Sequence, residues 1–207
     1  MTLSILQLNK ISLPNLYVIA GCNGAGKTTA SFTILPGMLN CKEFVNADGI
    51  AAGLSPFNPE SVAIEAGRLM LSRIEELLRV QVDFAIETTL ATRSYLSLIK
   101  KAQAVGYKVT LLYIWLDSPE TAKERVAIRV TKGGHNIPEE VIERRYYRGI
   151  SNLVNLFIPV VNTWMLVNST NVIIEPIAEG GQKVEKIISN DYIWGVIVEQ
   201  SKEYGNK

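Results

Sequence analysis

Five residues near the start of the sequence combine a glycine-rich spacing with a lysine and a hydroxyl group, in the order Gly21, Gly24, Gly26, Lys27 and Thr28. They follow an apolar run at residues 16–20 and precede residues 29–35, which can begin a helix. Glycines adopt backbone conformations that other residues avoid, so successive N–H groups can point at phosphate oxygens. Lys27 can then reach the β- and γ-phosphates, Thr28 can ligate Mg²⁺, and the helix dipole adds positive charge. This order of strand, glycine loop and helix predicts a site for a nucleoside triphosphate with Mg²⁺.

The alternative for this segment is a glycine-rich turn followed by a chance lysine and threonine. The flanking strand and helix favour a phosphate loop, because the motif has meaning only in that setting. The residues expected to contact the nucleotide are Gly21, Cys22, Asn23, Gly24, Ala25, Gly26, Lys27, Thr28 and Thr29.

Three acidic residues follow apolar runs that are typical of strands, namely Asp48, Glu87 and Asp117. Parallel sheets bind ligands at the carboxyl ends of their strands. One sheet would therefore bring these carboxylates to the same rim as Lys27. This convergence predicts a single active site.

Phosphoryl transfer requires an acceptor hydroxyl that is aligned and relieved of its proton. Asp48 is the candidate base, because it follows a short strand and Gly49 leaves room for a substrate. The alternative is an Asp-Gly turn, or the cap of a helix at residues 50–52. Glu87, helped by Thr89, is the candidate for binding the acceptor, against the alternative of a strand-end carboxylate that is satisfied within the protein.

Asp117 also has two interpretations. It ends an apolar strand, as a carboxylate that holds Mg²⁺ would. However, Asp117-Ser118-Pro119-Glu120 has the composition of a helix cap. We favour the cap.

A set of arginines flanks the flexible break at Gly133-Gly134, namely Arg125, Arg129, Arg144, Arg145 and Arg148. Guanidinium groups that swing over the γ-phosphate stabilise the transition state of phosphoryl transfer. Arg125 and Arg129 lie four residues apart, hence on one helix face, and are the favoured catalytic pair. The alternative is an exposed ion pair, such as Glu140 with Arg144. His135 is expected to be a loop residue rather than a catalyst, and Gly67 to mark close helix packing.

The elements that must position these residues alternate along the chain. The expected strands are residues 16–20, 43–46, 84–86, 109–116 and 171–174, with an edge strand at 183–188. The expected helices are residues 29–35, 93–104, 118–130, a segment from 138, and 191–203. Residues 55–60 are expected to be a loop and helix start, from which a further helix runs to about residue 80. This alternation implies right-handed crossovers and a mostly parallel sheet. We predict one α/β domain over residues 1–207, with a lid at about 118–150.

Composition narrows the class of protein. The chain has 207 residues and a net charge of +1, which argues against a basic nucleic-acid-binding face. Cys22 and Cys41 are expected to be free thiols, because a disulfide at Cys22 would hamper nucleotide entry. No apolar run is long enough to span a bilayer, and residues 1–14 lack the features of a signal peptide. A cytoplasmic protein with no membrane partner and no zinc site is therefore expected, since His135 is the single histidine.

Several short motifs together resemble the zeta toxin family. They are the loop from Gly21 to Thr29, Asn46-Ala47-Asp48, Leu54-Ser55-Pro56, Ala66-Gly67-Arg68, Glu87-Thr88-Thr89-Leu90, Gly106-Tyr107, Arg125-Val126 and Gly133-Gly134-His135. The match covers roughly residues 16–172 and is closest to the chromosomal branch of the family. The sequence differs from the toxins over residues 56–79 and in its Gly-Gly-His segment.

The resemblance implies a P-loop kinase-like three-layer sandwich that phosphorylates a small molecule with ATP and Mg²⁺. In zeta toxins the acceptor is a UDP-N-acetyl amino sugar. By motif position, Lys27 and Thr28 would bind phosphate and Mg²⁺, Asp48 would be the base, Glu87 and Thr89 would contact substrate, and Arg125 would contact the γ-phosphate. A small helical antitoxin is an expected partner. The competing hypothesis is a nucleotide-binding regulatory module with little or no kinase activity.

Overall fold

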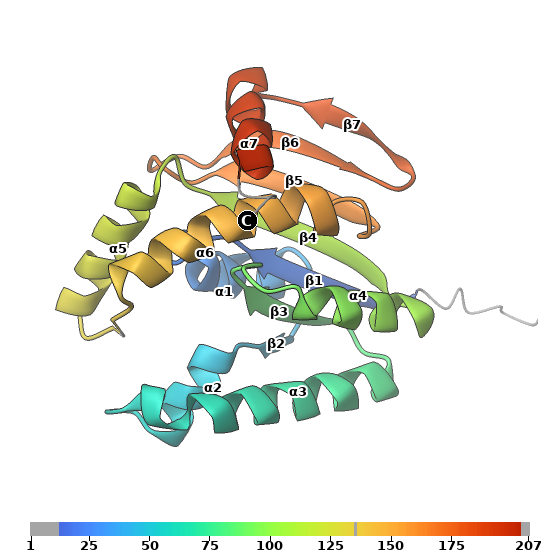
Figure 1. Ribbon diagram of the computed structural model, residues 1–207. Coiled ribbons are helices and arrows are strands. Elements are labelled where there is room, and N and C mark those ends of the chain that lie inside the picture. Colours follow the sequence, from blue (N-terminus) through green and yellow to red (C-terminus); the bar gives the residue numbers. More distant parts are fainter. Residues whose placement is uncertain (1–12, 135, 204–207) are drawn as a thin grey trace, which may run out of the picture.

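A seven-stranded sheet forms the centre of the molecule in a computed structural model, which describes residues 13–134 and 136–203 (Figure 1). Its strands are β1 (Asn15–Ala20), β2 (Glu43–Val45), β3 (Phe84–Thr88), β4 (Lys108–Trp115), β5 (Thr163–Asn168), β6 (Glu175–Gly181) and β7 (Val184–Ile188). Their order across the sheet is β2-β3-β1-β4-β5-β6-β7. The first five strands are parallel, and β6 and β7 are antiparallel additions at one edge.

Helices cover both faces of the sheet. They are α1 (Lys27–Gly37), α2 (Ala47–Leu54), α3 (Ala63–Val80), α4 (Ser94–Ala104), α5 (Pro119–Thr131), α6 (Glu139–Asn152) and α7 (Asp191–Glu203), with a 3-10 turn at Pro59–Val62 and a π-helical turn at Leu153–Phe157. Figure 1 shows α4, α6 and α7 in front of the sheet and α1 behind it. The expected three-layer sandwich with a mostly parallel sheet is therefore confirmed.

The central strands form where consecutive residues are apolar, so that both faces of the strand can be buried. β4 is the central example, with Val109, Leu111, Tyr113 and Ile114 all buried, as a strand covered on both faces requires. It pairs with β1 on one side and β5 on the other. Because β1 also pairs with β3, the phosphate loop after β1 lies between the ends of β3 and β4.

Helix α3 begins later than the sequence pattern predicts. Its buried stripe is the expected one, consisting of Ala66, Met70, Ile74, Leu77 and Leu78. However, the chain forms helix α2 and then a separate 3-10 turn at Pro59–Val62 before α3 starts at Ala63. The expected loop and helix start at residues 55–60 is therefore only a few residues early, because the proline of the Asn58-Pro59 pair begins a short 3-10 turn and the α-helix follows it.

The expected strand at residues 171–174 was also wrong. Val172 and Ile173 are exposed, at 102% and 74%, in the loop between β5 and β6. The strand that pairs with β4 is β5, whose Trp164 and Leu166 lie opposite Leu111 and Tyr113 and are buried. The apolar run at 171–174 resembles a strand in composition, but it begins after the Asn168 side chain has already turned the backbone by accepting a hydrogen bond from Thr170 N.

Two late elements and the region of the expected lid agree with the sequence. The edge strand β7 and the terminal helix α7 both form where they were predicted. The range 118–150 is occupied by α5 and most of α6, a helical pair that projects beyond the phosphate loop in Figure 1. Whether this pair moves as a lid stays a prediction. No helix in the described part of the chain has the length and apolarity needed to cross a membrane.

Candidate active site

The phosphate loop after β1 takes the open backbone that the motif predicts. Gly21, Gly24 and Gly26 have positive φ angles of 147°, 80° and 87°. A Cβ on Gly21 would stand 2.3 Å from the Ile114 carbonyl oxygen, and one on Gly24 would stand 2.8 Å from the Ala122 carbonyl oxygen. Gly26, by contrast, faces open space. Two glycines therefore let the loop press against β4 and α5, and the third leaves one side free for a ligand.

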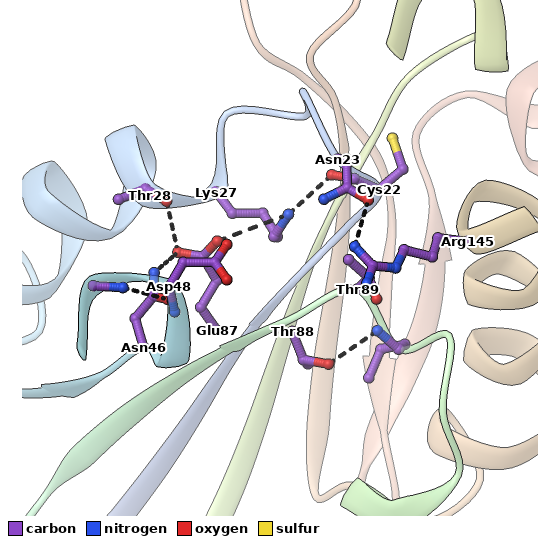
Figure 2. A network of polar contacts seen from close by, with 12 residues as sticks. Cys22, Asn23, Lys27, Thr28, Asn46, Asp48, Glu87, Thr88, Thr89 and Arg145 are labelled. Atoms are coloured by element: carbon purple, nitrogen blue, oxygen red, sulfur yellow. Dashed lines mark hydrogen bonds and ion pairs between the residues drawn. The ribbon is translucent and has the colours of Figure 1, made fainter. Parts of the chain in front are cut away.

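Lys27 opens helix α1 and points back into the loop. Its side chain is 8% exposed, and its Nζ donates to the Cys22 carbonyl oxygen at 2.9 Å (Figure 2). Nζ also lies 3.8 Å from Glu87 Oε1. Burial lowers the pKa of Lys27, and the negative charge of Glu87 partly opposes that shift. The first turn of α1 has no side-chain cap, so its amides are available to a phosphate.

Glu87, the residue before the last of β3, links the phosphate loop to the start of α2. Its Oε2 accepts hydrogen bonds from Thr28 Oγ1 at 2.8 Å and from Asn46 Nδ2 at 2.9 Å (Figure 2). The sequence led us to assign Glu87 to the acceptor, and the structure brings it beside Thr28 as well. A hydroxyl and a carboxylate oxygen at this spacing fit Mg²⁺, which prefers hard oxygen ligands and takes its remaining ligands from phosphates and water.

Asp117 lies apart from this group. It follows β4, and its backbone N donates to Thr170 Oγ1. Ser118 caps α5 by accepting from Thr121 N at 3.1 Å, so the favoured interpretation of this segment as a helix cap is confirmed. Asp117 lines neither of the cavities described below.

Asp48 lies in the first turn of α2, on the rim expected from the sequence. The cap of that helix is Asn46, whose Oδ1 accepts from Asp48 N at 2.8 Å and from Gly49 N at 3.4 Å. The alternative in which Asp48 itself caps a helix at residues 50–52 is therefore wrong. With the cap supplied by Asn46, the Asp48 carboxylate is free to face the adjoining cavities.

Two cavities meet at Asp48. The first, of about 580 Å³, extends from Lys27 and Glu87 to the wall formed by α3 and α4. The second, of about 660 Å³, lies between α2 and residues 133–134 and 136–145 near the α5–α6 turn. Asp48 and Arg145 line both. Lys27 and Asp48 thus face one cavity that is large enough for a small-molecule acceptor.

Thr89 lines the first cavity from the loop after β3. This loop has a strained backbone, because Leu90 has a φ of 56° although it is not glycine. Leu90 N donates to Thr88 Oγ1 at 3.0 Å, and Asn152 Nδ2 from α6 donates to the Leu90 carbonyl oxygen at 2.7 Å. Gly149 packs against the Thr89 carbonyl oxygen so closely that a Cβ there would stand 2.6 Å away. Helix α6 therefore fixes the loop that presents Thr89.

The arginines are separated by the fold. Arg145 donates from Nη1 to Asn23 Oδ1 at 3.4 Å and reaches over the phosphate loop (Figure 2). Arg125 points elsewhere, since its Nη2 donates to the carbonyl oxygens of Ser169 and Thr170 at 2.7 and 2.8 Å. Arg129 packs under Gly134, where a Cβ would stand 2.5 Å from its Cγ. Its charge is felt at Lys27, whose pKa it helps to lower.

The remaining basic candidates lie farther out. Arg144 lines the second cavity, and Arg148 lines neither. His135 lies outside the described residues. Contact of Arg125 and Arg129 with a γ-phosphate stays a prediction. Arg145 donates a hydrogen bond to the loop, whereas the stem of Arg125 packs beside Gly24 with its guanidinium held by Ser169 and Thr170.

Sequence reasoning missed the role of Asn46 and the contact that Asn23, an expected nucleotide-binding residue, makes with Arg145. The signal for Asn46 was present, because an asparagine directly before a helix is a preferred cap. Nothing local indicates the contact between Asn23 and Arg145, which are 122 residues apart. Arg68, quoted above only as part of a motif, lines the first cavity. The described residues contain no group of three or more His, Cys, Asp or Glu side chains that could hold a metal without a ligand's help.

Comparison with known proteins identifies relatives over most of the chain. A family model described as Zeta toxin matches residues 4–157. A protein of Haemophilus influenzae described as uncharacterized is 32% identical over 127 residues, which are 61% of this chain and 88% of that protein.

Solved structures share the fold. The AvrRxo1-ORF1:AvrRxo1-ORF2 complex with sulphate ions matches with a TM-score of 0.72 and 20% identity, over 89% of this chain. This chain spans only 63% of that one. The PezAT chromosomal toxin-antitoxin system of Streptococcus pneumoniae matches with a TM-score of 0.65 and 16% identity, over 93% of this chain and 87% of that one.

Proposed function

Since this chain belongs to the zeta toxin family and has a P-loop kinase fold, we propose that it transfers the γ-phosphoryl group of ATP to a hydroxyl of a small molecule. The observation that carries the proposal is that Lys27 and Asp48 face the same cavity. A related structure, titled as the AvrRxo1-ORF1:-ORF2 complex with ATP, supports the choice of nucleotide. Residues 1–207 would form one catalytic domain, with about 118–150 as its lid.

Each residue of the site has a distinct task in this proposal. The amides of the glycine loop and Lys27 bind the β- and γ-phosphates. Asp48 accepts the proton of the acceptor hydroxyl as its oxygen bonds to the γ-phosphorus, and the bond from phosphorus to the bridging oxygen of ADP breaks. Arg145, held by Asn23, balances the charge on the transferring group. Arg125 and Arg129, the pair that the sequence favours, are the alternatives to Arg145 for this contact with the transferring phosphoryl group.

Thr28 and Glu87 would hold Mg²⁺, the first directly and the second directly or through water. When bound, Mg²⁺ neutralises the β- and γ-phosphate oxygens and helps to align them. Thr89, and Glu87 where it is free of the metal, would contact the acceptor. The leading acceptor is a UDP-N-acetyl amino sugar, which family membership supports. A small antitoxin is the proposed protein partner, because two similar structures are of complexes with a second protein.

Mass spectrometry can test the proposal directly. We expect UDP-N-acetylglucosamine, or another metabolite in a cell extract, to gain the mass of one phosphate when incubated with the protein, ATP and Mg²⁺. Lys27→Ala should abolish the gain. Tight ATP binding with no phosphorylated product across the extract would instead favour the regulatory module.

Asp48→Asn tests the base. We expect kcat to fall by roughly 10²–10⁴, the usual contribution of general acid–base catalysis, because the amide cannot accept the proton. The affinity for ATP should stay within a few-fold of that of the unsubstituted protein, since Asp48 does not belong to the phosphate loop. Unchanged turnover in this variant would exclude Asp48 as the base.

A further inference from the structure

One face of α3 lines the first cavity without being covered by protein. Ile64, Arg68 and Leu71 are spaced by four and three residues, so they form a single stripe along the helix. This stripe is distinct from the buried stripe that packs on the core. Ile64 and Leu71 are 76% and 60% exposed, which leaves two apolar side chains facing the cavity on either side of a cation.

Among the cations that line this cavity, Arg68 is the one whose charge has no partner in the described residues. Lys27 lies 3.8 Å from Glu87, and Arg145 is held by Asn23, so both of these cations gather at the phosphate loop. Arg68 has no hydrogen bond or ion pair within the described part of the chain. Farther along α3, Arg73 differs, because its guanidinium binds Glu43 and Glu76 at 2.7 Å each. The Arg68 charge is therefore available to a ligand.

The opposite wall complements this stripe. Helix α4 contributes Ser94, Tyr95 and Leu98, and the segment before it contributes Thr92. The end of the cavity at the phosphate loop holds two carboxylates, Asp48 and Glu87, beside the two cations Lys27 and Arg145, so its charges balance within the protein. A negatively charged group on the acceptor would therefore be attracted chiefly by Arg68, whose charge has no partner in the described residues.

We infer that Arg68 binds an anionic group of the acceptor, a phosphate ester or a carboxylate, and thereby determines substrate specificity. Ile64 and Leu71 cover the adjoining apolar part of the acceptor, and its hydroxyl faces Asp48. A guanidinium suits this task, because its planar donors pair with two oxygens of a phosphate or carboxylate. The inference rests on the proposed function, since it assigns the first cavity to the acceptor.

Binding can be measured separately from turnover. The protein is first saturated with Mg²⁺ and the imido analogue of ATP, so that the phosphate loop is filled. It is then titrated by calorimetry with three sugars that differ in charge: N-acetylglucosamine, its 1-phosphate, and N-acetylmuramic acid, which carries a carboxylate. Arg68→Gln is compared with Arg79→Gln, a control in which an exposed arginine of the same helix lies outside the cavity.

We expect at least one anionic sugar to bind tenfold or more tightly than N-acetylglucosamine. Arg68→Gln should lower the affinity for that sugar by roughly 10- to 100-fold, as expected for the loss of a charge-assisted hydrogen bond. Arg79→Gln should leave this affinity unchanged. The preferred sugar also distinguishes a phosphate from a carboxylate. The inference is overturned if no sugar binds, if the neutral sugar binds as tightly, or if Arg68→Gln keeps the preference.

The two proposals fail differently. If the mass-spectrometric assay yields a phosphorylated product and Arg68→Gln leaves the KM of that acceptor unchanged, the role of Arg68 is refuted and the kinase stands. If the anionic sugar binds through Arg68 and no product forms with any acceptor, the kinase is refuted and the binding site stands.

Discussion

Single side chains serve two purposes around the phosphate loop. Asn46 caps α2 with its oxygen and donates to Glu87 with its nitrogen. It therefore fixes the helix that carries Asp48 and the carboxylate beside Thr28 at once. An aspartate at this position would keep the cap, but it would lose the donor and set a negative charge against Glu87.

Lys27 gives the site a dependence on pH. Burial holds its pKa below the ordinary value of 10.5, so the folded protein releases this proton more readily than an exposed lysine would. We expect the affinity for Mg-ATP to be constant below the pKa of Lys27 and to fall as the pH rises through it, because the neutral amine no longer attracts phosphate.

The variant Glu87→Gln tests whether the ionisation of Lys27 causes this dependence on pH. Glu87→Gln removes a negative charge that raises the pKa of Lys27, so the fall in affinity should begin at a lower pH. Fluorescence titration with a labelled ATP analogue between pH 7 and 10.5 would show it. An identical pH profile for the two proteins would contradict the coupling of Lys27 to Glu87.

Among the elements, α6 packs directly against the loop that presents Thr89. Gly149→Ala would place a Cβ 2.6 Å from the Thr89 carbonyl oxygen and 3.3 Å from the Tyr113 hydroxyl. We expect the free energy of unfolding to fall by about 1–3 kcal/mol, as is usual for overpacking. Urea denaturation would measure the change.

The chain offers a matched control in α7. Gly195 is exposed within that helix, and a Cβ there would meet nothing within 4 Å. Gly195→Ala should therefore stabilise the protein by about 0.5–1 kcal/mol, because alanine favours helix over glycine. A stabilising effect at Gly149 would show that α6 can move away from Thr89 at little cost.

Local pattern made part of this structure predictable. The phosphate loop, the buried strands and the rim position of Asp48 depend on residues that are close in sequence. The identity of β5 was missed, because the apolar run at 171–174 has the composition of a strand, and only the long-range pairing with β4 shows that Thr163–Asn168 is the strand. The direction of Arg125 was missed for a similar reason, since its acceptors lie more than 40 residues away.

On the scale of the whole molecule, the two cysteines report on the integrity of the core. Cys22 and Cys41 are free and each is only 2% exposed. Burial raises the pKa of both thiols to about 11. At pH 8 roughly one thiol in a thousand would be ionised, against a substantial fraction in an unfolded chain whose thiols have a pKa near 8.5.

We therefore expect a thiol reagent to label the native protein at least roughly 200-fold more slowly than the protein in 8 M urea, since about a quarter of the thiols are ionised in the unfolded chain. Mg-ATP should slow the labelling of Cys22 further, because ligand binding stabilises the folded state. Mass spectrometry of the labelled cysteines would assign each rate. Rapid modification of one thiol in the native protein would show that its surroundings open independently of the rest.

Arg125 has a mechanical consequence for the helical pair formed by α5 and α6. Its guanidinium clamps the middle of α5 to the carbonyl oxygens of Ser169 and Thr170, while Gly149 pins the far half of α6 to the Thr89 loop. Each helix of the pair is therefore tethered to the body of the protein at one point, and Arg145 lies between the two tethers, four residues before Gly149.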